Sequence, residues 1–155
     1  MKQDCACLCG ATRFAVNGEP IGRFFCHCTI CQTVYRKPFA DATFFWAGSI
    51  ALPDRRAIEF RRYRRPPALK RGLCPHCRNP AVAFMASGPL RVGFVPSQNF
   101  KNSAGLPEPA CHIFYERRVA DVEDSIPKIS GYWSSEAYVT RMILGALFRP
   151  NRAAI

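Results

Sequence analysis

The sequence predicts a mainly β fold with short helices and one longer helix near the C-terminus. Short runs rich in aromatic or β-branched residues recur along the chain, and prolines or glycines separate most of them. Helical patterning is confined to two segments, a short one directly after Cys31 and a longer one that starts near Ser134. We therefore expect a series of strands joined by turns, with the helices as additions to the sheet.

The strand candidates are spread over the first three quarters of the chain. The first of them has alternating side chains and ends at Asn17-Gly18, a dipeptide typical of tight turns. The candidates are residues 11–16, 22–26, 42–48, 57–63, 81–87, 90–95 and 111–116. Residues 97–109 are rich in turn-forming residues, and we expect a loop there.

The C-terminal helix is expected over about 134–148. Its N-cap should be Ser134 or Ser135, because serine is a residue type that caps helices. Apolar side chains recur at helical spacing on one face, at Val139, Met142, Ile143 and Ala146. We expect Trp46 and Trp133 to lie in the core.

Length and composition indicate one folded domain, residues 1–155. Apolar residues make up 48% of the chain, which is enough to build a core. No secretory signal is visible, and the longest apolar run, residues 142–148, is too short to span a bilayer. We therefore expect a cytoplasmic protein with no membrane partner, whose nine cysteines favour metal binding over disulfides.

Two pairs of cysteines have the spacing of metal-binding loops. Cys7 and Cys9 lie near the N-terminus, and Cys74 and Cys77 lie in mid-chain. Closely spaced pairs bring two ligands to one ion at little cost in chain entropy, and four thiolates form the closed tetrahedral set of structural zinc. The sequence predicts a structural zinc site made of these four residues.

A third group holds three cysteines within six positions, Cys26, Cys28 and Cys31. Three protein ligands and one open position are typical of a catalytic zinc. The open position could accept water or a substrate thiol, which binds metal as the thiolate. The sequence therefore predicts a second, catalytic zinc, and two zinc ions per chain in total.

The order of these groups resembles one known family. The segments "CLCG", "CHCTIC" and "RGLCPHC" follow the pattern of the glutathione-dependent formaldehyde-activating enzymes, a family that includes the centromere protein V type. The resemblance runs from about Cys7 to Tyr132 and implies a zinc-binding β-tent type fold, two zinc sites and carbon–sulfur lyase chemistry. It also implies a structural zinc at Cys7, Cys9, Cys74 and Cys77, and a catalytic zinc at Cys26, Cys28 and Cys31.

The chain departs from the family pattern outside the cysteines. Family members tend to have glycine at the positions that Arg36 and Arg78 occupy here, and a small hydroxyl residue where this chain has Arg64. The added arginines would favour an anionic substrate, and glutathione is one.

The reaction that we expect is the addition of an anionic thiol such as glutathione to formaldehyde, or its reversal. The product would be an S-hydroxymethyl adduct, as in S-(hydroxymethyl)glutathione synthase. Zinc would activate and orient the thiol at Cys26, Cys28 and Cys31. Because the uncatalysed addition could itself be fast, a carrier of the adduct is an alternative.

A different class of function also agrees with the charge of the chain. The formal net charge is +11, and residues 55–71 hold eight basic side chains against one acid, Glu59. A zinc-ribbon-like binding module could use these arginines to contact nucleic acid, with Phe60 or Tyr63 stacking on bases. The three-thiol group argues against this alternative, since a scaffold rarely leaves a zinc ligand position open.

The remaining histidines and cysteines have simpler expected roles. We expect His27 to point to solvent and His112 to be hydrogen-bonded within a strand, with each a weaker candidate for a zinc ligand. Cys5 could compete with the first pair for metal, and Cys111 should be a small buried apolar residue.

Overall fold

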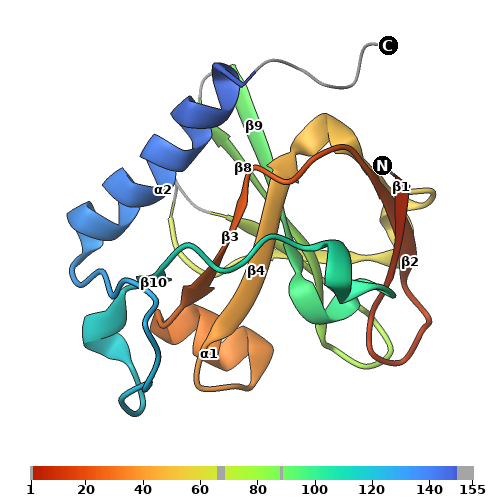
Figure 1. The fold of residues 1–155 in the computed structure, drawn as a ribbon. Helices are drawn as coiled ribbons and strands as arrows, with labels where there is room; N and C mark the ends of the chain where they lie inside the picture. The colour runs from red at the N-terminus through yellow and green to blue at the C-terminus, as the bar shows by residue number, and fades with distance from the viewer. Residues whose placement is uncertain (1, 66–68, 88, 150–155) are drawn as a thin grey trace.

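A seven-stranded sheet forms the centre of the molecule. The computed structural model describes residues 2–65, 69–87 and 89–149. Within these ranges, only the backbone of Arg55 and Ser87 is described. The strands lie in the order β10-β3-β4-β9-β8-β7-β6 (Figure 1). Their bounds are β3 Gly22–Cys26, β4 Ala40–Trp46, β6 Glu59–Arg62, β7 Lys70–Leu73, β8 Pro80–Ser87, β9 Leu90–Pro96 and β10 His112–Ile113. All neighbouring strands are antiparallel except β10, which pairs with β3 in parallel.

A three-stranded sheet and two α-helices complete the fold. The small sheet has the order β1-β2-β5, with β1 at Lys2–Ala6, β2 at Arg13–Asn17 and β5 at Ile50–Ala51. The helices are α1, Thr29–Tyr35, and α2, Tyr132–Leu147. Figure 1 shows α2 on one side of the large sheet and β1 and β2 on the other. The mainly β fold with short helices and a C-terminal helix is therefore confirmed.

Both faces of the large sheet are buried, and each carries its own core. Because successive side chains of a strand point to opposite faces, the adjacent Phe44 and Phe45 of β4 enter different cores. Phe44 packs in the core beneath α2, to which the helix contributes Ile143. Phe45 packs in the core with Phe14 of the small sheet. The first of these cores also contains Cys26 and Cys31, so the predicted catalytic group is built into it.

Most of the expected strands are present, and three observed strands were not expected. The candidate 22–26 coincides with β3, whereas 111–116 contains only the two-residue strand β10 before a turn of 3-10 helix. The unexpected strands are β1, β5 and β7. The loop expected over 97–109 contains no strand and only short 3-10 turns.

The C-terminal helix differs from the prediction at its start. Gly131 is the N-cap residue, so the prediction of Ser134 or Ser135 was wrong. Ser135 is instead fully buried, and its hydroxyl accepts a hydrogen bond from the backbone N–H of Phe114 at 2.8 Å. The predicted apolar face is confirmed, since Ile143 is buried and Val139, Met142 and Ala146 pack around it.

Trp133 corrects another expectation. It is 81% exposed, whereas Trp46 packs against the core as expected. No helix in the described part of the chain is both long enough and apolar enough to cross a membrane.

Candidate metal centres and active site

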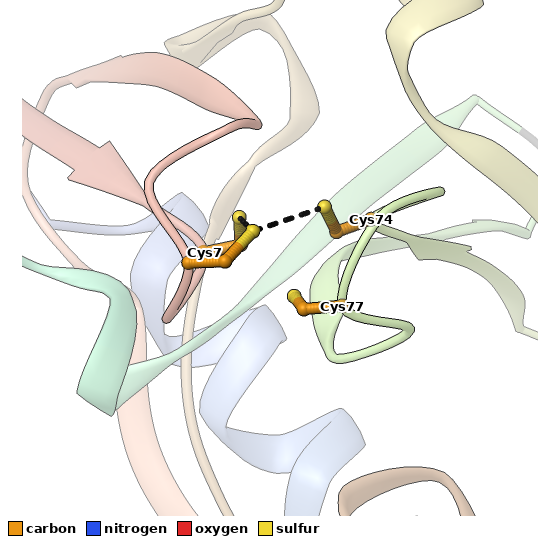
Figure 2. Close-up of side chains that lie close together, drawn as sticks. Cys7, Cys74 and Cys77 are labelled. Atoms are coloured by element: carbon orange, nitrogen blue, oxygen red, sulfur yellow. Dashed lines mark hydrogen bonds between the residues drawn. The ribbon is translucent and has the colours of Figure 1, made fainter.

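Four cysteines from distant parts of the chain meet beside the small sheet. Cys7 and Cys9 lie in the connection from β1 to β2, and Cys74 and Cys77 lie in the connection from β7 to β8. Figure 2 shows Cys7 on one loop, facing Cys74 and Cys77 on the other. Their four sulfur atoms all lie within 4.8 Å of one another.

Backbone hydrogen bonds shape both loops around the sulfur atoms. The backbone N–H of Thr12 donates to the Cys7 sulfur at 3.2 Å, and Gly10 lies between them with a positive φ of 75°. In the other loop, Arg78 has a φ of 61° and its N–H donates to the carbonyl of Cys74 at 2.9 Å. Both turns therefore depend on a residue in the left-handed region, which glycine adopts with least strain.

The spacing of these sulfur atoms is compatible with one tetrahedral ion. Zinc–sulfur bonds of about 2.3 Å at tetrahedral angles place sulfur atoms about 3.8 Å apart. The Cys7 and Cys9 sulfur atoms are 3.4 Å apart, and those of Cys9 and Cys74 are 3.7 Å apart. The four-cysteine cluster could therefore hold a metal ion with no ligand from outside the protein.

The second cluster lies at the junction of β3 and α1. Cys26 is the last residue of β3, Cys28 is the N-cap of α1, and Cys31 lies in the first turn of that helix. The backbone N–H of Cys31 donates to the Cys28 sulfur at 3.4 Å, so the thiol both caps the helix and belongs to the cluster. The three sulfur atoms lie within 4.8 Å of one another.

The three thiols strongly influence one another's ionisation. Hydrogen bonds from Cys26 and Cys31 lower the pKa of Cys28, while hydrogen bonding within the cluster, followed by burial, raises the pKa of Cys26. Without a cation, one negative charge therefore forms readily and further charges do not. A divalent cation would allow all three thiols to bind as thiolates, which is the ligand form of cysteine.

The three-thiol cluster opens into a cavity of about 400 Å³. Its walls come from the large sheet, α1, α2 and the segment after β10, including Phe24, Phe94, Ile30 and Val139. Among the described residues the cluster has no fourth metal-binding side chain within reach. One side of the cluster is therefore available to a molecule in the cavity.

Arg71 adds a positive charge next to this cluster. It lies on β7, is 8% exposed, and its Nη2 donates to the Cys31 sulfur at 3.7 Å. Its electrostatic attraction also lowers the pKa of Cys28, as a smaller contribution than the thiol hydrogen bonds. Arg71 is the arginine of "RGLCPHC", but its place beside the other cysteine group could not be inferred from sequence spacing.

His27 and His112 lie behind the cluster and are not part of it. His27 is fully buried, which corrects the expectation that it points to solvent. Its Nε2 lies 2.8 Å from Nδ1 of His112, and Nε2 of His112 donates to Asp124 at 2.9 Å. In a neutral imidazole one ring nitrogen donates and the other accepts, so Nδ1 of His112 accepts the hydrogen bond from Nε2 of His27. Nδ1 of His27 is therefore the unprotonated nitrogen. The sequence predicted that His112 is hydrogen-bonded within a strand, but it did not predict the contact between His112 and His27.

Cys5 and Cys111 belong to neither cluster. Each is buried in a hydrophobic core, and burial raises the pKa of the Cys5 thiol to about 12 and that of Cys111 to about 11. The expectation for Cys111 is confirmed, and Cys5 does not join the first pair.

Most of the described basic side chains in the segment 55–71 are exposed. Residues 66–68 and the side chain of Arg55 lie outside the described part of the structure. Arg71 is buried at the cluster, and Arg61 forms an ion pair with Glu59. Arg61 is nevertheless exposed, and so are the other described basic side chains of the segment, namely Arg56, Arg62, Arg64, Arg65 and Lys70.

Comparison with known proteins agrees with this arrangement. No curated protein matched the chain. The family described as glutathione-dependent formaldehyde-activating enzyme matches residues 2–117, a range that contains all seven clustered cysteines. Helix α2, which forms one wall of the cavity, lies beyond the matched range. Because the match covers about three quarters of the chain, this protein belongs to the glutathione-dependent formaldehyde-activating enzyme family.

Proposed function

We propose that this protein is a zinc-dependent carbon–sulfur lyase-type enzyme that makes or cleaves adducts between a thiol and an aldehyde. Its reaction would resemble that of S-(hydroxymethyl)glutathione synthase, with glutathione and formaldehyde as the reference pair. The observation that carries the proposal is the three-thiol cluster at the floor of a cavity, with one side open. A separate four-thiol cluster would hold the structural zinc.

Cys26, Cys28 and Cys31 would hold the catalytic zinc, and Cys7, Cys9, Cys74 and Cys77 the structural one. Zinc bound by three thiolates supplies a position at which a substrate thiol loses its proton. In the addition, a sulfur lone pair forms a bond to the carbonyl carbon of the aldehyde, the carbonyl π bond breaks with its electrons moving to oxygen, and the oxygen takes up a proton. The thiol proton is released, so atoms and charges balance.

The surrounding residues would support this reaction in two ways. The guanidinium of Arg71 offsets part of the negative charge that gathers at the cluster. The cavity would hold the thiol and the aldehyde together, which would lower the entropic part of the barrier. Arg64 and Arg117 line the same cavity and would attract an anionic thiol.

The test is a comparison of adduct formation by the native protein and by Cys28→Ser. Exchange NMR of glutathione with formaldehyde measures the interconversion of free thiol and adduct at equilibrium, where an uncatalysed background can be subtracted. The native protein should raise the exchange rate in proportion to its concentration, and Cys28→Ser should leave only the background. Cys111→Ser is the matched control, because Cys111 is a buried cysteine that belongs to neither cluster. This variant should retain the catalysed rate. Equal rates for the native protein and Cys28→Ser would refute catalysis of the glutathione reaction and leave the carrier role.

A further inference from the structure

The cavity over the three-thiol cluster is mostly apolar. Its inner walls are formed by residues of the large sheet, α1 and α2, chiefly Phe24, Ile30, Val82, Met85, Phe94 and Ile143. Its volume of about 400 Å³ is within the range of small-molecule sites, and formaldehyde, with one carbon and one oxygen, would fill little of it. The size and lining of this cavity therefore indicate a substrate with an apolar body.

Arg71 is a buried charged residue in the lining of this cavity. Among the described residues, its recorded partners are the Cys31 sulfur and the ring of Tyr63, whose centroid is 5.9 Å from the guanidinium carbon. No carboxylate of the described chain forms an ion pair with it, whereas the half-buried Arg23 is paired with Asp41. A guanidinium carries five N–H donors, and a buried charge is costly unless it is paired. Arg71 therefore has donors left for an anionic group in the cavity.

The charges around the cavity limit how much negative charge a ligand can bring. Arg64, Arg71 and Arg117 line it, but so do Glu116 and Glu136. The thiolates of the cluster add further negative charge. Arg71 is the cation that contacts a cluster sulfur, so it is placed to match a carboxylate close to a bound thiol.

Glutathione agrees poorly with this environment. It has two carboxylates, an ammonium group and two peptide bonds, and burying these groups against apolar walls leaves hydrogen bonds unmade. At least one peptide bond separates each of its carboxylates from the sulfur. Arg71, in contrast, lies only 3.7 Å from a cluster sulfur, so it could bind a carboxylate close to a thiol held there.

We propose that the thiol handled by this site carries a single carboxylate close to its sulfur and an apolar body beyond it. Arg71 binds the carboxylate, and the apolar body fills the cavity between the large sheet and α2. This inference rests on the proposed function, because it assigns the substrate class of the same three-thiol centre.

The test measures binding of four thiols to the zinc-loaded, full-length protein by isothermal titration calorimetry. α-Mercapto-β-phenylpropanoate has both the carboxylate and the apolar body. Mercaptoacetate lacks the benzyl group, β-phenylethanethiol lacks the carboxylate, and glutathione is the reference. We expect the first compound to bind most tightly, with a loss of about tenfold or more in affinity when either group is removed.

Arg71→Met separates recognition of the carboxylate from general support of the cluster. If Arg71 binds the carboxylate, this variant should bind α-mercapto-β-phenylpropanoate and β-phenylethanethiol with nearly equal affinity. If Arg71 only offsets the charge of the thiolates, both affinities should fall by the same factor and their ratio should not change. Zinc content is measured on the same samples. Val139→Trp, which narrows the cavity from α2, should reduce the advantage of the benzyl group over mercaptoacetate.

The outcomes distinguish this inference from the proposed function. Binding of glutathione as tight as that of α-mercapto-β-phenylpropanoate, or an unchanged ratio in Arg71→Met, would overturn the substrate class while thiol binding itself stood. The comparison of the four thiols on the native protein decides the matter even if the variants do not fold. Failure of every thiol to bind, together with no catalysed adduct exchange, would overturn both proposals.

Discussion

At the scale of single residues, two arginines occupy backbone positions that glycine adopts more easily. Arg36 follows α1 with a φ of 52°, and Arg78 follows the second cysteine pair with a φ of 61°. Both have side-chain partners that offset this strain. Nη2 of Arg36 donates to the carbonyl of Cys77 at 3.1 Å and to Asn79 at 3.2 Å, while Arg78 forms an ion pair with Glu59. Arg36 thus links the end of α1 to a loop of the four-cysteine cluster.

Substitutions at Arg36 should separate the backbone strain from the side-chain bonds. Arg36→Ala and Arg36→Gly both remove the two hydrogen bonds, but only glycine relieves the left-handed conformation. The glycine variant should therefore be more stable than the alanine variant by about 1 kcal/mol. Chemical denaturation at a fixed free zinc concentration measures the difference. Equal stability of the two variants would show that the backbone at this position is not strained.

His27 should make stability depend on pH. Burial lowers the pKa of His27 from its ordinary value of 6.5 to about 4. Between these values the unfolded chain binds a proton that the folded chain does not, so stability rises with pH. The free energy of unfolding should therefore decrease as pH falls from 6.5 towards 4, and this decrease should be smaller in His27→Asn. Identical pH dependence in the native protein and the variant would contradict the buried, neutral state of His27.

At the scale of elements, the short strand β10 supports the loop that carries the three thiols. It pairs with β3 through His112 and Phe25 and through Ile113 and Cys26. The backbone N–H of His27 donates to the carbonyl of Ile113 at 3.0 Å. The two-histidine contact adds a side-chain connection between the same segments. The loop is therefore fixed from behind, while its sulfur atoms face the cavity.

Removing His112 should weaken this support. His112→Phe keeps a ring of similar size but leaves Nε2 of His27 buried without a partner, which costs about 1–3 kcal/mol of stability. His76→Phe is the matched control, since His76 is exposed, and its effect should be small. Thermal unfolding of the zinc-loaded variants measures both effects. A loss no larger than that of the control would mean that the histidine pair adds nothing to the stability of the fold.

The elements that the sequence did not predict depend on pairing partners rather than on their own composition. β1 and β7 contain charged residues and little apolar patterning, at residues 2–6 and 70–73. β1 is held by a five-residue register with β2, and β7 lies between β6 and β8. Strands of this kind form because neighbouring strands satisfy their backbone groups, which a local pattern does not record.

At the scale of the whole molecule, the positive charge should affect how substrates arrive. The formal net charge of +11 creates an attractive field for anions that salt screens. Association of α-mercapto-β-phenylpropanoate should therefore slow as ionic strength rises, whereas association of the uncharged β-phenylethanethiol should not. Stopped-flow measurements on the native protein compare the two. The same salt dependence for both thiols would exclude electrostatic steering.

The two cysteine clusters could be predicted from the sequence, but the cavity could not. Each cysteine group is local, so its spacing alone identifies candidate ligands, and the order of the groups identified the family. The cavity is built from β3, β7, β8, β9 and α2, which are distant in sequence. Arg71 and Val139 meet there only through the tertiary fold, so neither could be assigned to the site beforehand.

The zinc content of the native protein, purified without chelators, tests the central claim most directly. Both clusters have the ligands for one ion each, and elemental analysis should find two zinc ions per chain. Cys28→Ser should retain one ion, and Cys111→Ser should retain two, because Cys111 lies in the core and outside both clusters. A native protein with a single zinc that Cys28→Ser does not lose would contradict the account, since the three-thiol centre would then hold no zinc.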